Sequence, residues 1–119
     1  MKKNCMYVLL GFIVLGCETK NADYYKIESK NKIINLDEIY EAKIFLLRTE
    51  EIDTNIQPVF YIINGQDTFY LPYDTKNHCA IYRGVGYKTG TVEWSGTFEY
   101  KTKNNRVIKT IFSDKYSVK

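Results

Sequence analysis

Two stretches near the C-terminus alternate between apolar and polar residues, and this pattern limits the possible folds more than any other feature. They are "TVEWSGTFEY", residues 91–100, and "RVIKTIFSDKYSV", residues 106–118. Each places its large apolar residues on one face: Val92, Trp94, Phe98 and Tyr100 in the first, and Ile108, Phe112, Tyr116 and Val118 in the second. A period of two with one apolar face predicts antiparallel strands that cover a core. Asn104 and Asn105 suit left-handed turn positions, so we expect a hairpin of roughly ten residues a side.

The segment "IYEAKIFLLR", residues 39–48, alternates in the same way. Its apolar face carries Tyr40, Ala42, Ile44 and Leu46. Phe45 and Leu47 lie on the opposite face, so both faces are partly apolar, which favours a central position in a sheet.

Two shorter segments also predict strands. Asn64-Gly65 separates Val59–Ile63 from Thr68–Leu71, a spacing that predicts a second hairpin. The segment "HCAIYRG", residues 78–84, predicts one more short strand. With 11 Tyr, 6 Phe and only 2 Pro in the chain, the composition also favours β structure. We therefore predict an all-β fold, an immunoglobulin-like antiparallel β-sandwich of six or seven strands, with an open barrel as the competing architecture.

The N-terminus has the pattern of an export signal. Lys2 and Lys3 precede an uncharged apolar run over residues 6–15. A membrane-spanning helix needs about 20 apolar residues, so this run is too short to span and is typical of a secretory signal peptide. A buried terminal helix is the alternative.

The end of this run, Val14-Leu15-Gly16-Cys17, resembles the bacterial lipobox. The resemblance implies that residues 1–16 are a cleaved lipoprotein signal peptide and that the Cys17 sulfur is the lipid attachment site, carrying acyl chains such as palmitate. Leu15 departs mildly from the usual pattern, and an ordinary signal peptide is the alternative. Two or three acyl chains anchor a protein stably to a membrane.

The remaining chain is predicted to have two parts. Residues 17–31 are polar and lysine-rich and predict a tether, within which Tyr24–Ile27 has the character of a first edge strand. Residues 32–119 are then the sandwich domain. The tether has no dense acidic run of the kind that sends some lipoproteins to the cell surface, so we expect a location in the cell envelope, on the outer membrane, facing the periplasm.

Few residues suggest catalysis. Without Cys5, which leaves with the signal, and Cys17, Cys79 has no disulfide partner, and we expect it to be a small buried hydrophobic residue. His78 adjoins it, but neighbours in a strand point to opposite faces, which argues against a Cys–His pair. We expect a polar surface histidine and no catalytic residue.

Metal, nucleotide and nucleic-acid sites are also disfavoured. Glu50, Glu51 and Asp53, with Asn55 nearby, offer oxygen ligands for calcium, but their spacing does not match a calcium loop and a solvated acidic turn is favoured. One His and one free Cys cannot form a zinc site. Gly84-x-Gly86 lacks the third glycine of a nucleotide motif. Without Lys2 and Lys3 the chain has fifteen basic and fourteen acidic residues, too balanced for nucleic-acid binding. We predict no cofactor and no metal.

Tyrosines are the best sequence clue to binding. Four of them fall between residues 70 and 87: Tyr70, Tyr73, Tyr82 and Tyr87. Tyrosine is enriched in interface hot spots, and it also stacks on sugars. The alternative is that these are half-buried strand residues.

The order "YEAKIFL", "YIINGQDTFYL", "AIYRGVGYKTGTVEWSGTFEY" and "FSDKYSV" resembles the periplasmic immunoglobulin-like domains of the Bacteroidetes gliding-motility protein GldM. The matching residues are Tyr40, Glu41 and Ala42; Asn64 and Gly65; Tyr82, Gly90 and Gly96; and Phe112, Tyr116 and Val118. The resemblance covers about residues 33–119 and implies the sandwich fold. That family couples an inner-membrane motor to outer-membrane machinery, but nothing here resembles its motor-binding segment.

These observations together predict a non-enzymatic, lipid-anchored interaction module of the envelope, with another envelope protein as partner and a possible accessory role in motility or secretion. The alternative is an envelope carbohydrate binder or a small hydrolase inhibitor.

Overall fold

The computed structural model describes residues 18–19 and 24–119, and these form strands joined by turns. The strands are β1 (Glu18–Thr19), β2 (Tyr25–Ser29), β3 (Ile33–Ile34), β4 (Ile39–Leu46), β5 (Val59–Asn64), β6 (Asp67–Tyr70), β7 (Tyr73–Asp74), β8 (Cys79–Val85), β9 (Gly90–Lys101) and β10 (Val107–Val118). Seven of these have four residues or more, which agrees with the predicted six or seven, whereas β1, β3 and β7 have two. A single 3-10 turn, η1 (Thr49–Glu51), is the one helical element in the described ranges.

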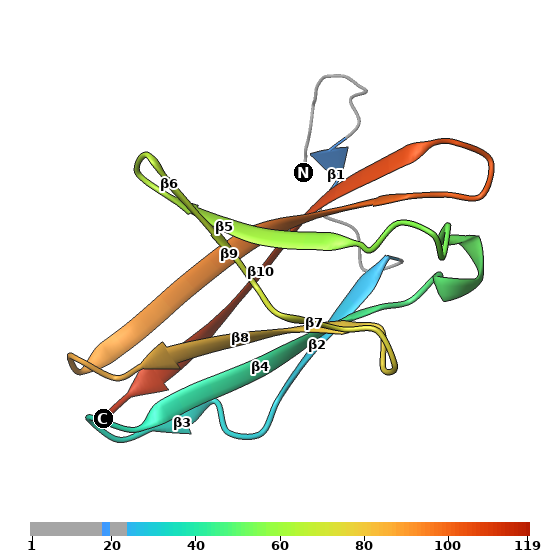
Figure 1. The fold of residues 1–119 in the computed structure, drawn as a ribbon. Helices are drawn as coiled ribbons and strands as arrows, with labels where there is room; N and C mark the ends of the chain where they lie inside the picture. The colour runs from blue at the N-terminus through green and yellow to red at the C-terminus, as the bar shows by residue number, and fades with distance from the viewer. Residues whose placement is uncertain (1–17, 20–23) are drawn as a thin grey trace.

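The strands form two sheets that pack face to face (Figure 1). The larger sheet has the order β1-β10-β9-β5-β6, with β3 also on β10, and the smaller has the order β2-β4-β8-β7. In immunoglobulin notation β2, β4, β8 and β7 are the A, B, E and D strands, and β10, β9, β5 and β6 are G, F, C and C′. The predicted immunoglobulin-like β-sandwich is therefore confirmed by its strand order.

The long C-terminal hairpin is confirmed in its position and its faces. Strands β9 and β10 pair antiparallel from Lys101 opposite Val107 to Gly90 opposite Val118, twelve residues a side. Asn105 in the connecting turn has a φ of 69°, the left-handed conformation expected for an Asn there. The second hairpin is confirmed as well, because Asn64 pairs with Asp67 across a two-residue turn in which Gly65 has a φ of 66°.

The core between the sheets is largely aromatic. The predicted apolar faces of β4, β9 and β10 point into it, and the rings of Tyr40, Phe60, Phe98 and Phe112 are almost fully buried. Phe60 occupies the C strand, where antibody domains place a buried Trp. Close packing extends to the backbone: a Cβ atom on Gly96 would lie 2.6 Å from Phe112 Cζ and 2.8 Å from the Tyr61 carbonyl oxygen. The β9 backbone therefore approaches its neighbours at a distance that requires glycine.

The sandwich begins earlier in the chain than predicted. Strand β2 lies inside the segment expected to be a tether and pairs antiparallel with β4 at the edge of the smaller sheet. The Tyr25 ring contacts the Phe98 and Phe112 rings at centroid distances of 6.0 and 6.3 Å. The edge strand expected at Tyr24–Ile27 is therefore present as β2, and its inward residues Tyr25 and Ile27 pack against the core of the sandwich.

The predicted signal peptide, residues 1–16, and the predicted lipid attachment site, Cys17, lie outside the residues that the structure describes. Within the described ranges, no helix has the length and apolar character needed to cross a membrane.

Candidate interaction surface

His78 and Cys79 do not form a reactive pair. The Cys79 side chain is buried inside the smaller sheet, and burial raises the pKa of its thiol. His78 was expected to begin a strand, but it has a φ of 55° and ends the turn before β8. Its Nδ1 lies 3.4 Å from the Tyr73 hydroxyl. Burial raises the pKa of Tyr73 to about 12. Which of the two groups donates in this contact depends on the tautomer of the His78 ring.

A shallow depression of about 290 Å³ lies beside His78, at the end of the sandwich that holds η1. Its lining contains no Asp, Glu, Lys or Arg: Thr49, Ile52, Thr54, Asn55, Ile56, Gln57, Pro58, Tyr73, Thr75 and His78. The lining combines hydroxyl and amide groups with aliphatic side chains. Such a surface suits a small neutral polar ligand.

The acidic residues of the same end do not converge. The Asp53 carboxylate accepts a hydrogen bond from the Asn55 amide at 3.0 Å, a local turn interaction, and Glu50 and Glu51 are exposed on η1. Across residues 18–19 and 24–119 no three His, Cys, Asp or Glu side chains come together as a metal-binding group. The geometry is that of a solvated acidic turn.

The glycines of Gly84-x-Gly86 have a packing role. A Cβ atom on Gly84 would lie 2.6 Å from the Tyr116 hydroxyl, and one on Gly86 would lie 2.9 Å from Val118 Cγ1 and 3.0 Å from the Asn35 carbonyl oxygen. Both glycines let β8 and the following loop pass close to neighbouring elements.

The four candidate tyrosines divide into two pairs. Tyr73 stacks on Phe60 at 5.7 Å, and Tyr82 stacks on Trp94 at 4.1 Å with the rings 4° from parallel. These two pack against the core and are half-buried strand residues. Tyr70 and Tyr87 are 69% and 85% exposed, so only this pair is available to a partner.

Tyr70 belongs to an exposed apolar surface on the β5–β6 hairpin. Ile63, Phe69 and Tyr70 are each more than half exposed, at 64%, 53% and 69%. Figure 1 shows the turn of this hairpin at the upper left, away from the strands of the smaller sheet. On the outer face of the sheet Tyr70 lies beside Tyr61, whose hydroxyl donates a hydrogen bond to Glu99 Oε2 at 2.6 Å.

Strand β6 is also the last strand of the larger sheet, so among the described residues one side of its backbone has no neighbouring strand. The Leu71 amide donates to the Phe60 carbonyl at 2.8 Å, which makes Phe60 and Leu71 a hydrogen-bonded pair. Pairs alternate along an antiparallel ladder, so in the register of β5 and β6 the N–H and C=O groups of Asp67 and Phe69 point toward β5. Those of Thr68 and Tyr70 point outward, at the open edge.

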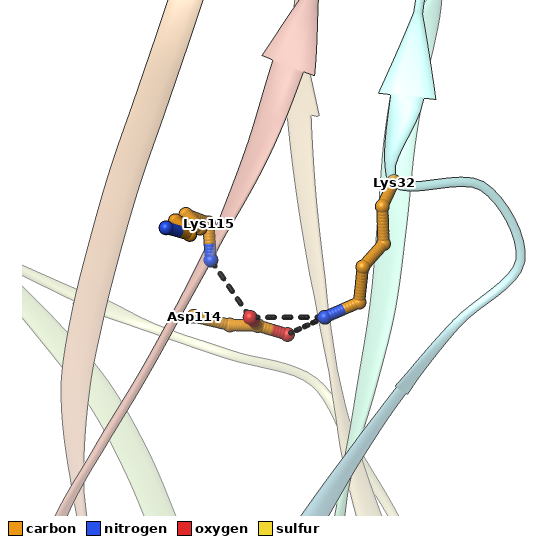
Figure 2. Close-up of polar contacts among 3 residues, drawn as sticks. All are labelled: Lys32, Asp114 and Lys115. Carbon is orange, nitrogen blue, oxygen red and sulfur yellow. Dashed lines mark hydrogen bonds and ion pairs between the residues drawn. The ribbon is translucent and has the colours of Figure 1, made fainter.

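The opposite edge of the same sheet is protected. Strands β1 and β3 pair parallel with two separate parts of β10, at Lys109–Thr110 and Ser117–Val118. Between these two parts of β10, Asp114 lies at a position where the alternation of the strand points side chains toward the core, and its side chain is 17% exposed. It forms an ion pair with Lys32 at 3.2 Å (Figure 2). Its Oδ1 also accepts a hydrogen bond from the Lys115 amide. An inward charge at an edge opposes the addition of another strand.

The two edge strands of the smaller sheet, β2 and β7, are protected in other ways. Strand β2 carries Lys26 and Glu28, which form an ion pair at 3.0 Å. Strand β7 has two residues and follows Pro72, which cannot donate a hydrogen bond. Where β8 continues past β7, Arg83 forms an ion pair with Glu41 at 2.8 Å. Thr68, Phe69 and Tyr70 thus form an uncharged, exposed run on a terminal strand.

A second exposed apolar group lies near the C-terminus, where Ile39 pairs with Val85 and Tyr87 follows. The hydrogen-bonding groups of β4 there are satisfied by β8, and Gly86 exchanges backbone hydrogen bonds with Asp37 and Glu38. This second group therefore offers side chains to a partner, whereas the β5–β6 hairpin offers side chains and backbone groups together.

Sequence reasoning identified Tyr70 as a binding candidate, but it did not predict that β6 ends the sheet. The run Thr68-Phe69-Tyr70 lacks the charge expected of a protected edge, but this signal has a meaning only once the order of the strands is known. Comparisons with known proteins give no further guide: no protein-family model, no curated protein and no solved structure matches this chain.

Proposed function

We propose that this protein is a non-enzymatic, lipid-anchored protein of the cell envelope whose sandwich is a protein-interaction module, with the β5–β6 hairpin as its contact surface. The observation that carries the proposal is the exposure of Ile63, Phe69 and Tyr70 on the β5–β6 hairpin, whose terminal strand β6 has outward backbone groups. Aromatic side chains at such a position are typical of interface anchors, and an open edge supplies main-chain hydrogen bonds to an extended partner.

The anchor and the location are supported by sequence only. The lipobox-like Val14-Leu15-Gly16-Cys17 supports attachment through Cys17. The resemblance of residues 33–119 to the GldM domains favours an accessory role beside motility or secretion machinery. The lack of a dense acidic run after Cys17 favours a location on the outer membrane, facing the periplasm. Mass spectrometry of the exported protein tests the anchor: a diacylglyceryl thioether on an N-terminal Cys17 is expected, and an unmodified Cys17 would exclude it.

Site-specific photo-crosslinking tests the contact surface. A photoreactive phenylalanine in place of Tyr70 is expected to join the full-length protein to one defined envelope protein in intact cells. The matched control is the same residue in place of Tyr87, which is also an exposed tyrosine but lies in the loop between β8 and β9, outside the hairpin. The partner must then bind the purified chain in detergent and bind the Phe69→Asp variant at least ten-fold more weakly. Cross-linking from Tyr87 alone would show that the hairpin is the wrong surface.

A second candidate function is supported by the depression beside His78. Its neutral hydroxyl, amide and aliphatic lining suits a sugar. Titration of the protein with N-acetylglucosamine and its short oligomers, followed by NMR of the His78 ring, is the direct measurement. A saturable shift that is lost in Asn55→Ala supports a carbohydrate binder, and an unchanged His78 signal excludes these sugars.

A further inference from the structure

We propose that the strand which β6 accepts is β6 of a second copy of this chain, paired antiparallel about a two-fold axis at Phe69. The inference rests on the proposed function, because it assigns the partner of the same hairpin. It would join two larger sheets into one continuous sheet.

The outward backbone groups define the register. Both copies must keep the same face of the sheet outward, so a two-fold axis perpendicular to the sheet pairs residues of equal parity. An axis at Phe69 places Thr68 of each copy opposite Tyr70 of the other, so two equivalent Thr68–Tyr70 pairs form. Thr68 and Tyr70 are the residues whose N–H and C=O groups point away from β5. Each such pair then exchanges both N–H···O bonds, as in a regular antiparallel ladder.

The side chains also fit this register. The Phe69 rings, 53% exposed in one copy, lie directly opposite each other and form an aromatic cross-strand pair. Thr68 lies beside Tyr70 on the outer face. The one charged residue of the strand, Asp67, lies opposite Leu71, so the two Asp67 carboxylates are about four residues apart along the strand, or roughly 13 Å. That separation exceeds the Debye length of about 8 Å at physiological salt, so their repulsion is screened.

The competing symmetric register is less favourable. An axis at Thr68 would place Tyr70 opposite Gln66, which lies in the turn outside β6. It would also separate the two Phe69 rings. The register centred on Phe69 is self-complementary in three respects. The outward backbone groups pair with each other, the two Phe69 rings lie opposite each other, and the two Asp67 carboxylates stay apart. This self-complementarity favours a second copy of the chain over an unrelated strand as the partner.

The pairing should be weak in dilute solution. A four-residue strand covers far less than the 1,200 Å² or so of a stable specific interface. Anchoring to a membrane raises the effective concentration of one copy near another. Dimers are therefore expected in the membrane at natural density and only at high concentration in detergent.

Cysteine cross-linking of the full-length protein in its own membranes tests the register. Directly opposite, non-hydrogen-bonded residues have Cα atoms about 4.5 Å apart, within the range of a disulfide. The Phe69→Cys variant is expected to give a disulfide-linked dimer on mild oxidation. Asp67→Cys, on the same side of the same strand, is the matched control and should give at least ten-fold less. The unaltered chain shows any background from its native cysteines.

A second pair of variants keeps the Phe69 ring. Co-expressed Thr68→Cys and Tyr70→Cys chains should cross-link to each other. Neither should cross-link to itself, because diagonal neighbours lie about 7–8 Å apart and exceed disulfide reach. Equal cross-linking of Asp67→Cys and Phe69→Cys, or self-linking of Thr68→Cys, would overturn the register.

A proline variant tests the backbone hydrogen bonds. Thr68→Pro removes an N–H that faces solvent, a position where an edge strand tolerates proline. Added to Phe69→Cys, it is expected to reduce the cross-link at least ten-fold while the circular dichroism spectrum and melting temperature stay close to those of Phe69→Cys alone. An undiminished cross-link in a folded protein would contradict strand pairing.

The two proposals fail in different ways. If Phe69→Cys stays monomeric while the photo-crosslinker at Tyr70 joins a different protein, the second copy is the wrong occupant and the interaction module stands. If the hairpin cross-links to nothing, both proposals are wrong.

Discussion

The two edges of the larger sheet contrast sharply although they belong to one continuous set of hydrogen-bonded strands. The β10 edge is covered by β1 and β3 and carries the inward Asp114, which is held by Lys32. The β6 edge has exposed Phe69 and Tyr70 and no covering strand in the described part of the chain.

The difference shows that edge protection is a property of side chains and short added strands, and that the sheet itself does not provide it. At β10 a buried face continues to the edge, so an open edge there would expose the core. At β6 the hairpin extends away from the core, and its side chains can remain exposed without loss of stability. The β10 edge therefore serves the fold, and the β6 edge is free to serve binding.

The largest expected effect separates the two edges by stability. Phe112 on β10 is fully buried against the Trp94 and Phe98 rings, so Phe112→Ala should reduce the free energy of unfolding by about 3–5 kcal/mol. Phe69→Ala at the open edge should change it by less than about 0.5 kcal/mol. Urea denaturation followed by tryptophan fluorescence measures both. A large loss in Phe69→Ala would mean that the hairpin is part of the core.

A smaller effect appears at alkaline pH. Burial, and next the neighbouring Tyr116 and Tyr40, raise the pKa of Tyr82 to about 12, against about 10 in the unfolded chain. Between pH 10 and 12 the unfolded chain therefore loses a proton that the folded chain keeps, and the free energy of unfolding falls as the pH rises. Tyr82→Phe removes this contribution.

The Tyr82→Phe protein should consequently lose about 1 kcal/mol less than the unaltered protein between pH 10 and 12, a figure reduced for the partial exposure of the ring. Tyr70→Phe, at the exposed edge, is the matched control and should follow the unaltered protein. Thermal melts at a series of pH values give the comparison. Parallel curves for all three proteins would contradict it.

The smallest expected effect concerns the two edge carboxylates. Asp114→Asn removes the ion pair with Lys32, whose side chain is 61% exposed, and should cost roughly 0.5–1 kcal/mol at low salt and less at high salt. Asp67→Asn at the open edge should leave the free energy of unfolding unchanged within about 0.5 kcal/mol. Urea titrations at two salt concentrations measure the free energy of unfolding of both variants. An equal change in the two variants would contradict the prediction that only the Asp114 edge is stabilised by charge.

The sequence predicted those parts of the fold that have a long local pattern. The alternation of Trp94, Phe98 and Tyr100, and the turn chemistry of Asn105 and Gly65, are enough to place two hairpins and their faces, because side-chain period and turn conformation are local properties.

The remaining features depend on contacts between distant residues. Strands of two residues, such as β1 and β3, have no periodicity to detect. Lys26 and Glu28 of β2 are as typical of a polar tether as of an exposed edge strand, so the sequence alone did not show that the sandwich begins at β2. Tyr82 and Tyr70 have the same chemistry in the sequence, and only the neighbours of each strand decide which is half-buried against the core and which is exposed. The open edge of β6 could not be predicted either, since it follows from the order of strands.

The two sheets are connected by aromatic stacking in place of a covalent bridge. Antibody domains join their B and F strands by a disulfide, but in the described part of this chain Cys79 is the sole cysteine and it is unpaired. Formation of the sandwich consequently requires no oxidant and no disulfide isomerase. The domain should reach the same structure in a reducing and in an oxidising compartment, so its integrity is independent of the redox state of its surroundings.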